Sequence, residues 1–304
     1  MSNLNINIAG VEFKNPLIAA SGCIGFGREY EKFFPLSALG GISTKGTTYA
    51  PRNGNEPPRV AETSSGILNS VGLQNPGIDA FIDEELPYLS AQNTVVIANI
   101  AADTIEQFSE MAAKLDNTCV DMLEINISCP NVKQGGMAFG VCANTAANVT
   151  RAVRKSTTKP IVLKLSPNVT DITEIARAVE SEGADAVSLI NTLLGMRIDI
   201  KTRRPILRNN IGGLSGPAIF PVALRMVWQT ANSVKIPVIG MGGISTAEDA
   251  IEMMMAGATA FQVGTALFGD PLCCVKIIDG INTWADENKI KNISNITKTV
   301  KRWS

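Results

Sequence analysis

The chain has 304 residues and contains no histidine. Histidine is the commonest general base, a common metal ligand and the partner of the nucleophile in Ser-His and Cys-His pairs. Its absence excludes those pairs. Any acid–base chemistry in this protein must therefore use cysteine, lysine, aspartate, glutamate, serine or tyrosine.

The sequence also lacks a strong charge imbalance, paired cysteines and long apolar runs. It has 27 basic and 28 acidic residues, and its only basic run is the short tail at residues 298–302, so nucleic acid and anionic membranes are poor candidate partners. None of its six cysteines forms a Cys-x-x-Cys pair, which argues against zinc or an iron–sulfur cluster held by this chain alone.

No segment approaches the roughly 18 apolar residues of a membrane span, and residues 1–8 lack the features of a secretion signal. We therefore expect a cytoplasmic protein.

Aromatic residues are scarce at 5%, whereas hydrophobic residues make up 45% of the chain. This aliphatic composition is typical of parallel sheets that are buried on both faces. Short β-branched runs alternate with amphipathic helical segments, and the runs cover residues 17–20, 41–45, 95–99, 122–127, 161–165, 186–191, 238–242 and 260–264. Eight strands in a chain of this length predict one domain over residues 1–304, folded as an α/β TIM (β/α)8 barrel.

Three further segments add to this minimal barrel. The alternating polarity of residues 4–13 predicts an N-terminal hairpin that closes the end of the barrel opposite the site. Residues 47–74, rich in Pro, Gly and Asn, and residues 193–216 are long connections after strands. Long connections in a compact domain are usually functional, and barrel enzymes place their sites at the C-terminal face. We therefore expect both insertions to roof a pocket there.

Glycines follow the last two predicted strands. Gly242 and Gly243 follow the seventh strand, Gly264 and Thr265 follow the eighth, and Gly216 ends the second insertion. Backbone amides without a neighbouring Cβ can close on an anion, and barrels often bind phosphate between these two strands. The pattern favours a phosphate site, although glycines that serve only tight turns are the alternative.

Polar side chains stand at the ends of several other apolar strands. Lys45 and Lys164 can neutralise an anionic ligand, act as a Schiff-base nucleophile, or simply reach solvent. Cys129 directly follows an apolar strand, which favours a chemical role for its thiol over a structural one. Carboxamides at the same level suit a planar heterocycle with alternating C=O and N–H groups; they are Asn69, Asn99, Asn126, Asn131 and Asn191.

Read together, these stretches resemble the class 1 dihydroorotate dehydrogenases, which are flavin enzymes of pyrimidine biosynthesis. The resemblance covers nearly the whole chain, in Ala20-Ser-Gly22, Lys45-Gly-Thr-Thr48, Asn69-Ser-Val-Gly-Leu-Gln-Asn-Pro-Gly77, Asn126 to Asn131, Lys164-Leu-Ser-Pro-Asn168, Ile190-Asn-Thr192, Gly212-Gly-Leu-Ser-Gly-Pro217, Met241-Gly-Gly243 and Val263-Gly-Thr265. The segments around Asn75-Pro-Gly77 and Cys129 look more like class 1B than class 1A. Two features of the expected lid at residues 132–142 depart from the pattern of relatives, namely Gln134 and Val141-Cys142-Ala143.

The resemblance implies a set of cofactor and substrate contacts. The FMN contacts would be Ser21, Lys45, Gly46, Asn99, Asn126, Lys164, Ile190, Gly216, Gly242, Gly243, Gly264 and Thr265. The substrate contacts would be Lys45, Asn69, Ser70, Val71, Gly72, Leu73, Asn126, Asn131, Asn191 and Thr192. No metal site is expected.

The resemblance also implies the chemistry. Oxidation of dihydroorotate to orotate removes a proton from C5 and a hydride from C6, so the site needs a base on one side of a flat ring and the flavin on the other. Cys129 would be the base, Lys164 would stabilise the reduced flavin, and Lys45 would bind the substrate carboxylate or the flavin.

A class 1B catalytic subunit forms a homodimer that pairs with an iron–sulfur flavoprotein, and together they make a heterotetramer. The partner carries FAD and a 2Fe-2S cluster and passes electrons to NAD⁺. Three alternatives stay open: a class 1A enzyme that uses fumarate, a phosphate-binding aldolase with Lys164 as the Schiff-base nucleophile, and a non-catalytic barrel that binds a phosphate ligand.

Overall fold

The computed structural model describes residues 2–128 and 139–303. Eight parallel strands close into a barrel in chain order, and the last strand pairs with the first. The barrel strands are β3 (Leu17–Ala19), β4 (Gly41–Ser43), β7 (Val95–Ile100), β8 (Met122–Asn126), β9 (Ile161–Lys164), β10 (Ala186–Leu189), β15 (Val238–Met241) and β16 (Ala260–Val263). The predicted TIM barrel is confirmed, and each predicted strand ends within one or two residues of the observed one.

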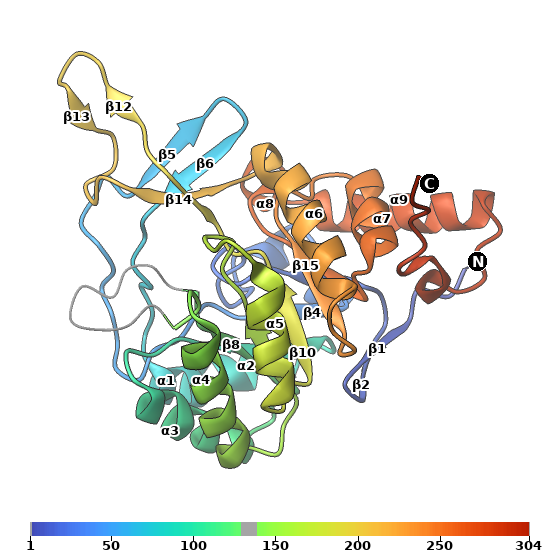
Figure 1. Cartoon of the computed structure of the whole chain (residues 1–304), viewed down its shortest axis with the longest axis horizontal. Helices are drawn as coiled ribbons and strands as arrows, with labels where there is room; N and C mark the ends of the chain where they lie inside the picture. Colours follow the sequence, from blue (N-terminus) through green and yellow to red (C-terminus); the bar gives the residue numbers. More distant parts are fainter. Residues whose placement is uncertain (1, 129–138, 304) are drawn as a thin grey trace.

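Helices surround the barrel (Figure 1). The longer ones are α3 (Ile105–Asp116), α4 (Ala143–Ser156), α5 (Ile172–Ser181), α6 (Phe220–Ala231), α7 (Ala247–Ala256) and α9 (Cys273–Glu287), and the short ones are α1 (Ile78–Ala80), α2 (Leu86–Ser90) and α8 (Ala266–Gly269). A π-helical turn, Phe81–Glu85, joins α1 to α2, and 3-10 turns lie at Tyr30–Lys32, Leu36–Ala38, Pro217–Ile219 and Ile293–Ile296.

Local sequence signals set the helix ends. The side chain of Asp171 accepts a hydrogen bond from the Thr173 amide at the start of α5, and Thr246 forms a capping box with Asp249 at the start of α7. Gly257 ends α7 with a φ of 126°, which a residue with a side chain rarely adopts. In the part of the chain that the structure describes, no helix is long and apolar enough to cross a membrane.

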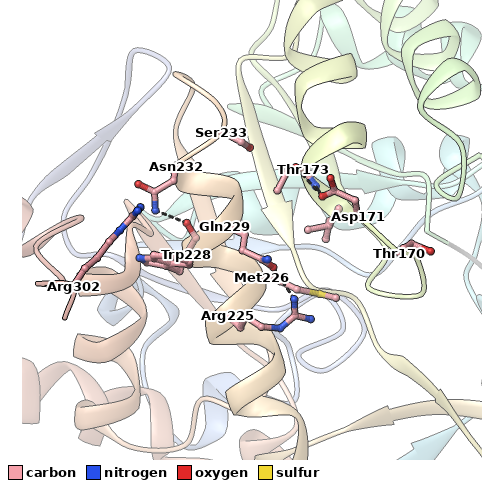
Figure 2. Close-up of a pocket in the computed structure, with 11 residues that line it drawn as sticks. Thr170, Asp171, Thr173, Arg225, Met226, Trp228, Gln229, Asn232, Ser233 and Arg302 are labelled. Atoms are coloured by element: carbon pink, nitrogen blue, oxygen red, sulfur yellow. Dashed lines mark hydrogen bonds between the residues drawn. The ribbon is translucent and has the colours of Figure 1, made fainter. Parts of the chain in front are cut away.

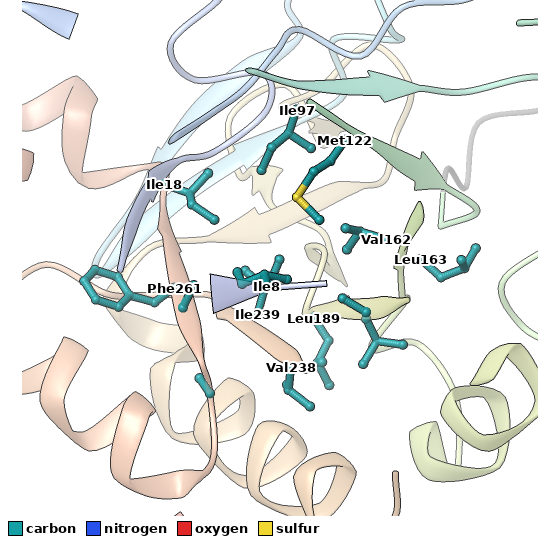
Figure 3. Close-up of a cluster of buried hydrophobic side chains, with 14 of the residues drawn as sticks. Ile8, Ile18, Ile97, Met122, Val162, Leu163, Leu189, Val238, Ile239 and Phe261 are labelled. Carbon is teal, nitrogen blue, oxygen red and sulfur yellow. The ribbon is translucent and has the colours of Figure 1, made fainter. Parts of the chain in front are cut away.

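The core lies inside the barrel and between the strands and the helices. Figure 3 shows buried side chains of this core from several barrel strands, including Met122, Val162 and Phe261. Ile8 joins them from the N-terminal hairpin of β1 (Ile6–Ile8) and β2 (Val11–Phe13). A Cβ atom on Gly41, the first residue of β4, would lie 2.9 Å from the Phe13 ring. The hairpin therefore covers the N-terminal end of the barrel, as predicted.

The two insertions pair with each other, which the sequence analysis did not predict. A four-stranded antiparallel sheet contains, in order, β11 (Leu193–Gly195), β14 (Gly212–Ser215), β6 (Gly66–Asn69) and β5 (Val60–Thr63). A small hairpin of β12 (Ile198–Asp199) and β13 (Arg204–Pro205) projects beyond it (Figure 1). The pairing joins Asn69 to Gly213. Such a distant contact leaves no periodic signal in either segment.

Candidate active site

A cavity of about 570 Å³ opens at the C-terminal ends of the barrel strands. The antiparallel sheet covers it through Val60, Ile67 and Ser215, so the insertions roof the pocket as expected. Most residues expected from the resemblance line this one cavity: Ser21, Lys45, Gly46, Asn69, Val71, Gly72, Leu73, Asn126, Lys164, Ile190, Asn191, Thr192, Gly216, Gly242, Gly243, Gly264 and Thr265. Asn99 and Ser70 do not line it, whereas Cys129 and Asn131 lie outside the described residues.

The glycine-rich end of the cavity has no room for side chains. Gly216 and Gly243 have φ values of 101° and 78°, which favour glycine. A Cβ atom on Gly243 would lie 2.7 Å from Phe220 Cβ, and one on Gly216 would lie 2.7 Å from Gly66 Cα. Both glycines line the cavity with their backbone, and backbone amides without side chains suit the close approach of a phosphate group.

Lys164 is 5% exposed and lines the cavity from the end of β9. Its Nζ lies 3.8 Å from Oε2 of Glu124 on β8. The alternative of a strand-end lysine that merely reaches solvent is therefore wrong for Lys164. Lys45 is half-buried at another edge of the same cavity.

Glu124 is the functional candidate that the sequence analysis missed. Its side chain is fully buried in the barrel and ionised at neutral pH. Burial acts to raise the pKa of Glu124, but Lys164 and hydrogen bonds from Ser43, Ser188 and Asn99 outweigh it, so the pKa lies below its usual value. The available signal was an acid in the middle of the apolar strand 122–126, since carboxylates are almost never fully buried unless paired.

Asn99 and Ser70 lie behind the lining of the cavity. Asn99 is fully buried, and its Oδ1 would lie 2.9 Å from a Cβ atom on Gly46. Ser70 is 2% exposed and its Oγ has no hydrogen-bond partner among the described residues. Its backbone oxygen accepts a hydrogen bond from the side chain of Asn55.

A chain of polar side chains connects the ends of β8 and β10. Asn126 Oδ1 accepts hydrogen bonds from the Ser128 amide, at 3.3 Å, and from Ser128 Oγ, at 2.9 Å. Asn191 Nδ2 donates to the same Ser128 Oγ, and Asn191 Oδ1 accepts from the Thr192 amide at 2.8 Å. Ser128 therefore fixes both carboxamides in one orientation, and Cys129 is the next residue in the chain.

Cys23 also lines the cavity. Burial raises the pKa of the Cys23 thiol to about 11, and nearby Lys164 and Lys45 offset only part of that effect. The thiol is therefore neutral at physiological pH, and a neutral thiol is a poor base and a poor nucleophile.

A second cavity, of about 360 Å³, lies between the start of α5 and α6 (Figure 2). The Arg302 guanidinium stacks over the Trp228 ring at 4.7 Å, and Arg225 donates to Gln229. None of the residues expected to bind a cofactor or substrate lines this cavity. Among the residues described, no group of three or more cysteine, aspartate or glutamate side chains is placed to hold a metal ion.

Comparison with known proteins gives the family. The dihydroorotate dehydrogenase family profile matches residues 3–284, and this chain belongs to that family. It is 54% identical to a protein of Thermoanaerobacter pseudethanolicus over 299 residues, which cover 98% of this chain and 99% of that protein. It is also 54% identical to proteins of Geotalea uraniireducens and Parabacteroides distasonis, in each case over 97% of both chains. All three relatives are named dihydroorotate dehydrogenase B (NAD(+)), catalytic subunit.

Proposed function

We propose that this chain is the catalytic subunit of a class 1B dihydroorotate dehydrogenase and forms a single domain over residues 1–304. It would oxidise (S)-dihydroorotate to orotate in pyrimidine biosynthesis. The observation that carries the proposal is the 570 Å³ cavity at the strand ends, because its lining combines a glycine-rich end, two lysines and a set of carboxamides. The relatives' shared name, over nearly the full length of each chain, supports the same activity.

The residues present fit FMN. The phosphate would lie against the glycines at 216, 242, 243 and 264, where added side chains would collide with neighbouring atoms. The ring system would lie over Lys164 and Gln262, and the buried oxygens Asn99 Oδ1 and Gln262 Oε1 have no partner in the described part of the chain. When bound, FMN supplies the acceptor for the C6 hydride.

The remaining residues act on the substrate. Lys45 would bind its carboxylate, while Asn69, Asn126 and Asn191 would hold the ring by its C=O and N–H groups. Cys129 would take the C5 proton; a free cysteine has a pKa of about 8.5, so the rate should rise with pH toward that value. Asn131 and the backbone around Ser70 would complete the substrate contacts.

The electrons would leave through a partner. The relatives are named as catalytic subunits and carry NAD(+) in their names, which supports a partner subunit. From the resemblance to class 1B, we propose a homodimer of this chain associated with an iron–sulfur flavoprotein that would hold FAD and a 2Fe-2S cluster. The same names favour class 1B over a fumarate-using class 1A enzyme. The aldolase alternative is disfavoured because the relatives, similar over nearly the full length of each chain, share the name of an oxidoreductase.

The Cys129→Ser variant tests this proposal. We expect it to retain FMN but to oxidise dihydroorotate slower by about two orders of magnitude or more, because general base catalysis contributes roughly 10²–10⁴-fold and a hydroxyl is a far weaker acid than a thiol. The measurement is dihydroorotate oxidation by the purified chain with a dye as electron acceptor. Cys119→Ser, the same change at an exposed cysteine, is the matched control. Equal rates in both variants would remove Cys129 from the proposed role.

A further inference from the structure

Two charged side chains are buried inside the barrel, and the proposed chemistry uses only one of them. Within the described residues, Glu124 and Lys164 are the charged residues of the buried core. Lys164 lines the cavity, whereas Glu124 lies beneath it and does not. Burying a carboxylate is costly unless it is fully compensated, so its place at the floor of the site calls for a function.

Four neutral donors satisfy the two oxygens of Glu124. Oε1 accepts from Ser188 Oγ and from Gln262 Nε2, each at 2.7 Å. Oε2 accepts from Ser43 Oγ at 2.7 Å and from Asn99 Nδ2 at 2.6 Å. These donors come from four different strands, and Lys164 adds a fifth. Both oxygens of the carboxylate are therefore hydrogen-bonded by side chains from around the barrel.

The carboxylate also fixes which way two amides face. A carboxylate only accepts hydrogen bonds, so Asn99 and Gln262 must turn their NH₂ groups toward it. Their carbonyl oxygens then point elsewhere, and both oxygens are buried without a hydrogen-bond partner among the described residues. Gln262 lines the cavity, and Asn99 Oδ1 lies behind Gly46, which also lines it. Glu124 therefore fixes the orientation of the Gln262 amide, which lines the cavity as Lys164 does, and of the Asn99 amide, which lies one layer behind the lining.

We propose that Glu124 is a positioning residue that sets the redox potential of bound FMN, because it anchors Lys164 and fixes the orientation of the Gln262 amide, two groups that line the cavity. This inference rests on the proposed function, since it requires FMN in the cavity. The negative charge of Glu124 offsets part of the field of Lys164 and thereby limits the stabilisation of an anionic reduced flavin. Removal of the Glu124 charge would leave the positive charge of Lys164 uncompensated. It would also allow the Gln262 amide to turn its NH₂ group toward the flavin. Both changes favour the reduced state of the flavin.

The test compares Glu124→Gln with Ser188→Ala in the FMN-loaded protein. Glu124→Gln removes the charge and keeps the size, whereas Ser188→Ala removes one hydrogen bond to the same carboxylate and keeps the charge. The midpoint potential of bound FMN is measured anaerobically against redox dyes, and the FMN dissociation constant by fluorescence. We expect Glu124→Gln to favour reduced FMN at least tenfold, a rise of about 30 mV for a two-electron couple, and Ser188→Ala to shift the potential by less than half as much. Equal potentials in wild type and Glu124→Gln, or equal shifts in the two variants, would overturn the proposal.

Glu124→Asp provides the test if Glu124→Gln does not fold. Aspartate keeps the charge but is one methylene shorter, so it cannot reach all five partners at once. We expect FMN to bind at least tenfold more weakly to this variant than to wild type, and the midpoint potential of bound FMN to rise above the wild-type value. Unchanged affinity and potential would overturn the inference. A wild-type chain that cannot bind FMN would instead refute the proposed function, so the two failures are distinguishable.

Discussion

Gly243→Ala perturbs the glycine-rich end of the cavity without changing its charge. The added Cβ would lie 2.7 Å from Phe220 Cβ, 2.8 Å from the Phe220 nitrogen and 2.9 Å from the Gly216 oxygen, at a φ of 78°. Two of these atoms belong to the backbone, so the turn itself has to move. The φ strain alone costs about 1–3 kcal/mol, and the collision adds to it. We expect at least tenfold weaker FMN binding, or about 1.4 kcal/mol, together with a lower melting temperature.

The assay is FMN titration of the apoprotein followed by flavin fluorescence. Gly269→Ala is the matched control, because a Cβ there would meet no atom within 4 Å and Gly269 lies at the exposed end of α8. Alanine is also the better helix former. We therefore expect the control to bind FMN as wild type does and to be equally or slightly more stable. Equal FMN affinity in the two variants would refute the assignment of this turn to the phosphate.

Two further predictions concern charge and electron transfer. The pKa of Glu124 in the folded protein lies below its usual value. The ionised side chain therefore stabilises the fold above about pH 4.3, the pKa of glutamate in the unfolded chain. This stabilisation is lost as the pH falls through the pKa of Glu124 in the folded protein. The difference in melting temperature between wild type and Glu124→Gln should then become smaller from pH 7 to pH 3.5. A constant difference would contradict the lowered pKa of Glu124 in the folded protein. The isolated chain should reduce NAD⁺ poorly, because it has neither a dinucleotide-binding motif of the Gly-x-Gly-x-x-Gly type nor Cys-x-x-Cys pairs. Rapid NAD⁺ reduction without a partner subunit would count against class 1B.

Features encoded within one short segment could be predicted from the sequence. The strands followed from β-branched runs, and the ends of α5 and α7 from Asp171, Thr246 and Gly257. The glycine-rich strand ends, Lys45, Lys164 and several carboxamides could be placed at the cavity because the C-terminal ends of barrel strands converge on one face. The other expected contacts were implied by the resemblance to the dihydroorotate dehydrogenases.

Features that depend on distant contacts could not be predicted. The sheet over the cavity pairs residues 69 and 213, which are far apart in the chain. The role of Glu124 depends on partners from five other strands, from Ser43 to Gln262. The position of Asn99 behind Gly46 follows from its hydrogen bond to Glu124. In each case the deciding contact joins segments whose proximity only the closed barrel creates.

We propose that this chain by itself holds the complete site for dihydroorotate oxidation. Anaerobic mixing of the purified, FMN-loaded protein with dihydroorotate, while the flavin absorbance is followed, measures this activity without a partner subunit. We expect stoichiometric bleaching of the flavin with formation of one orotate per chain, and a large loss of the bleaching rate in Cys129→Ser. Flavin that stays oxidised in the presence of excess dihydroorotate would contradict it.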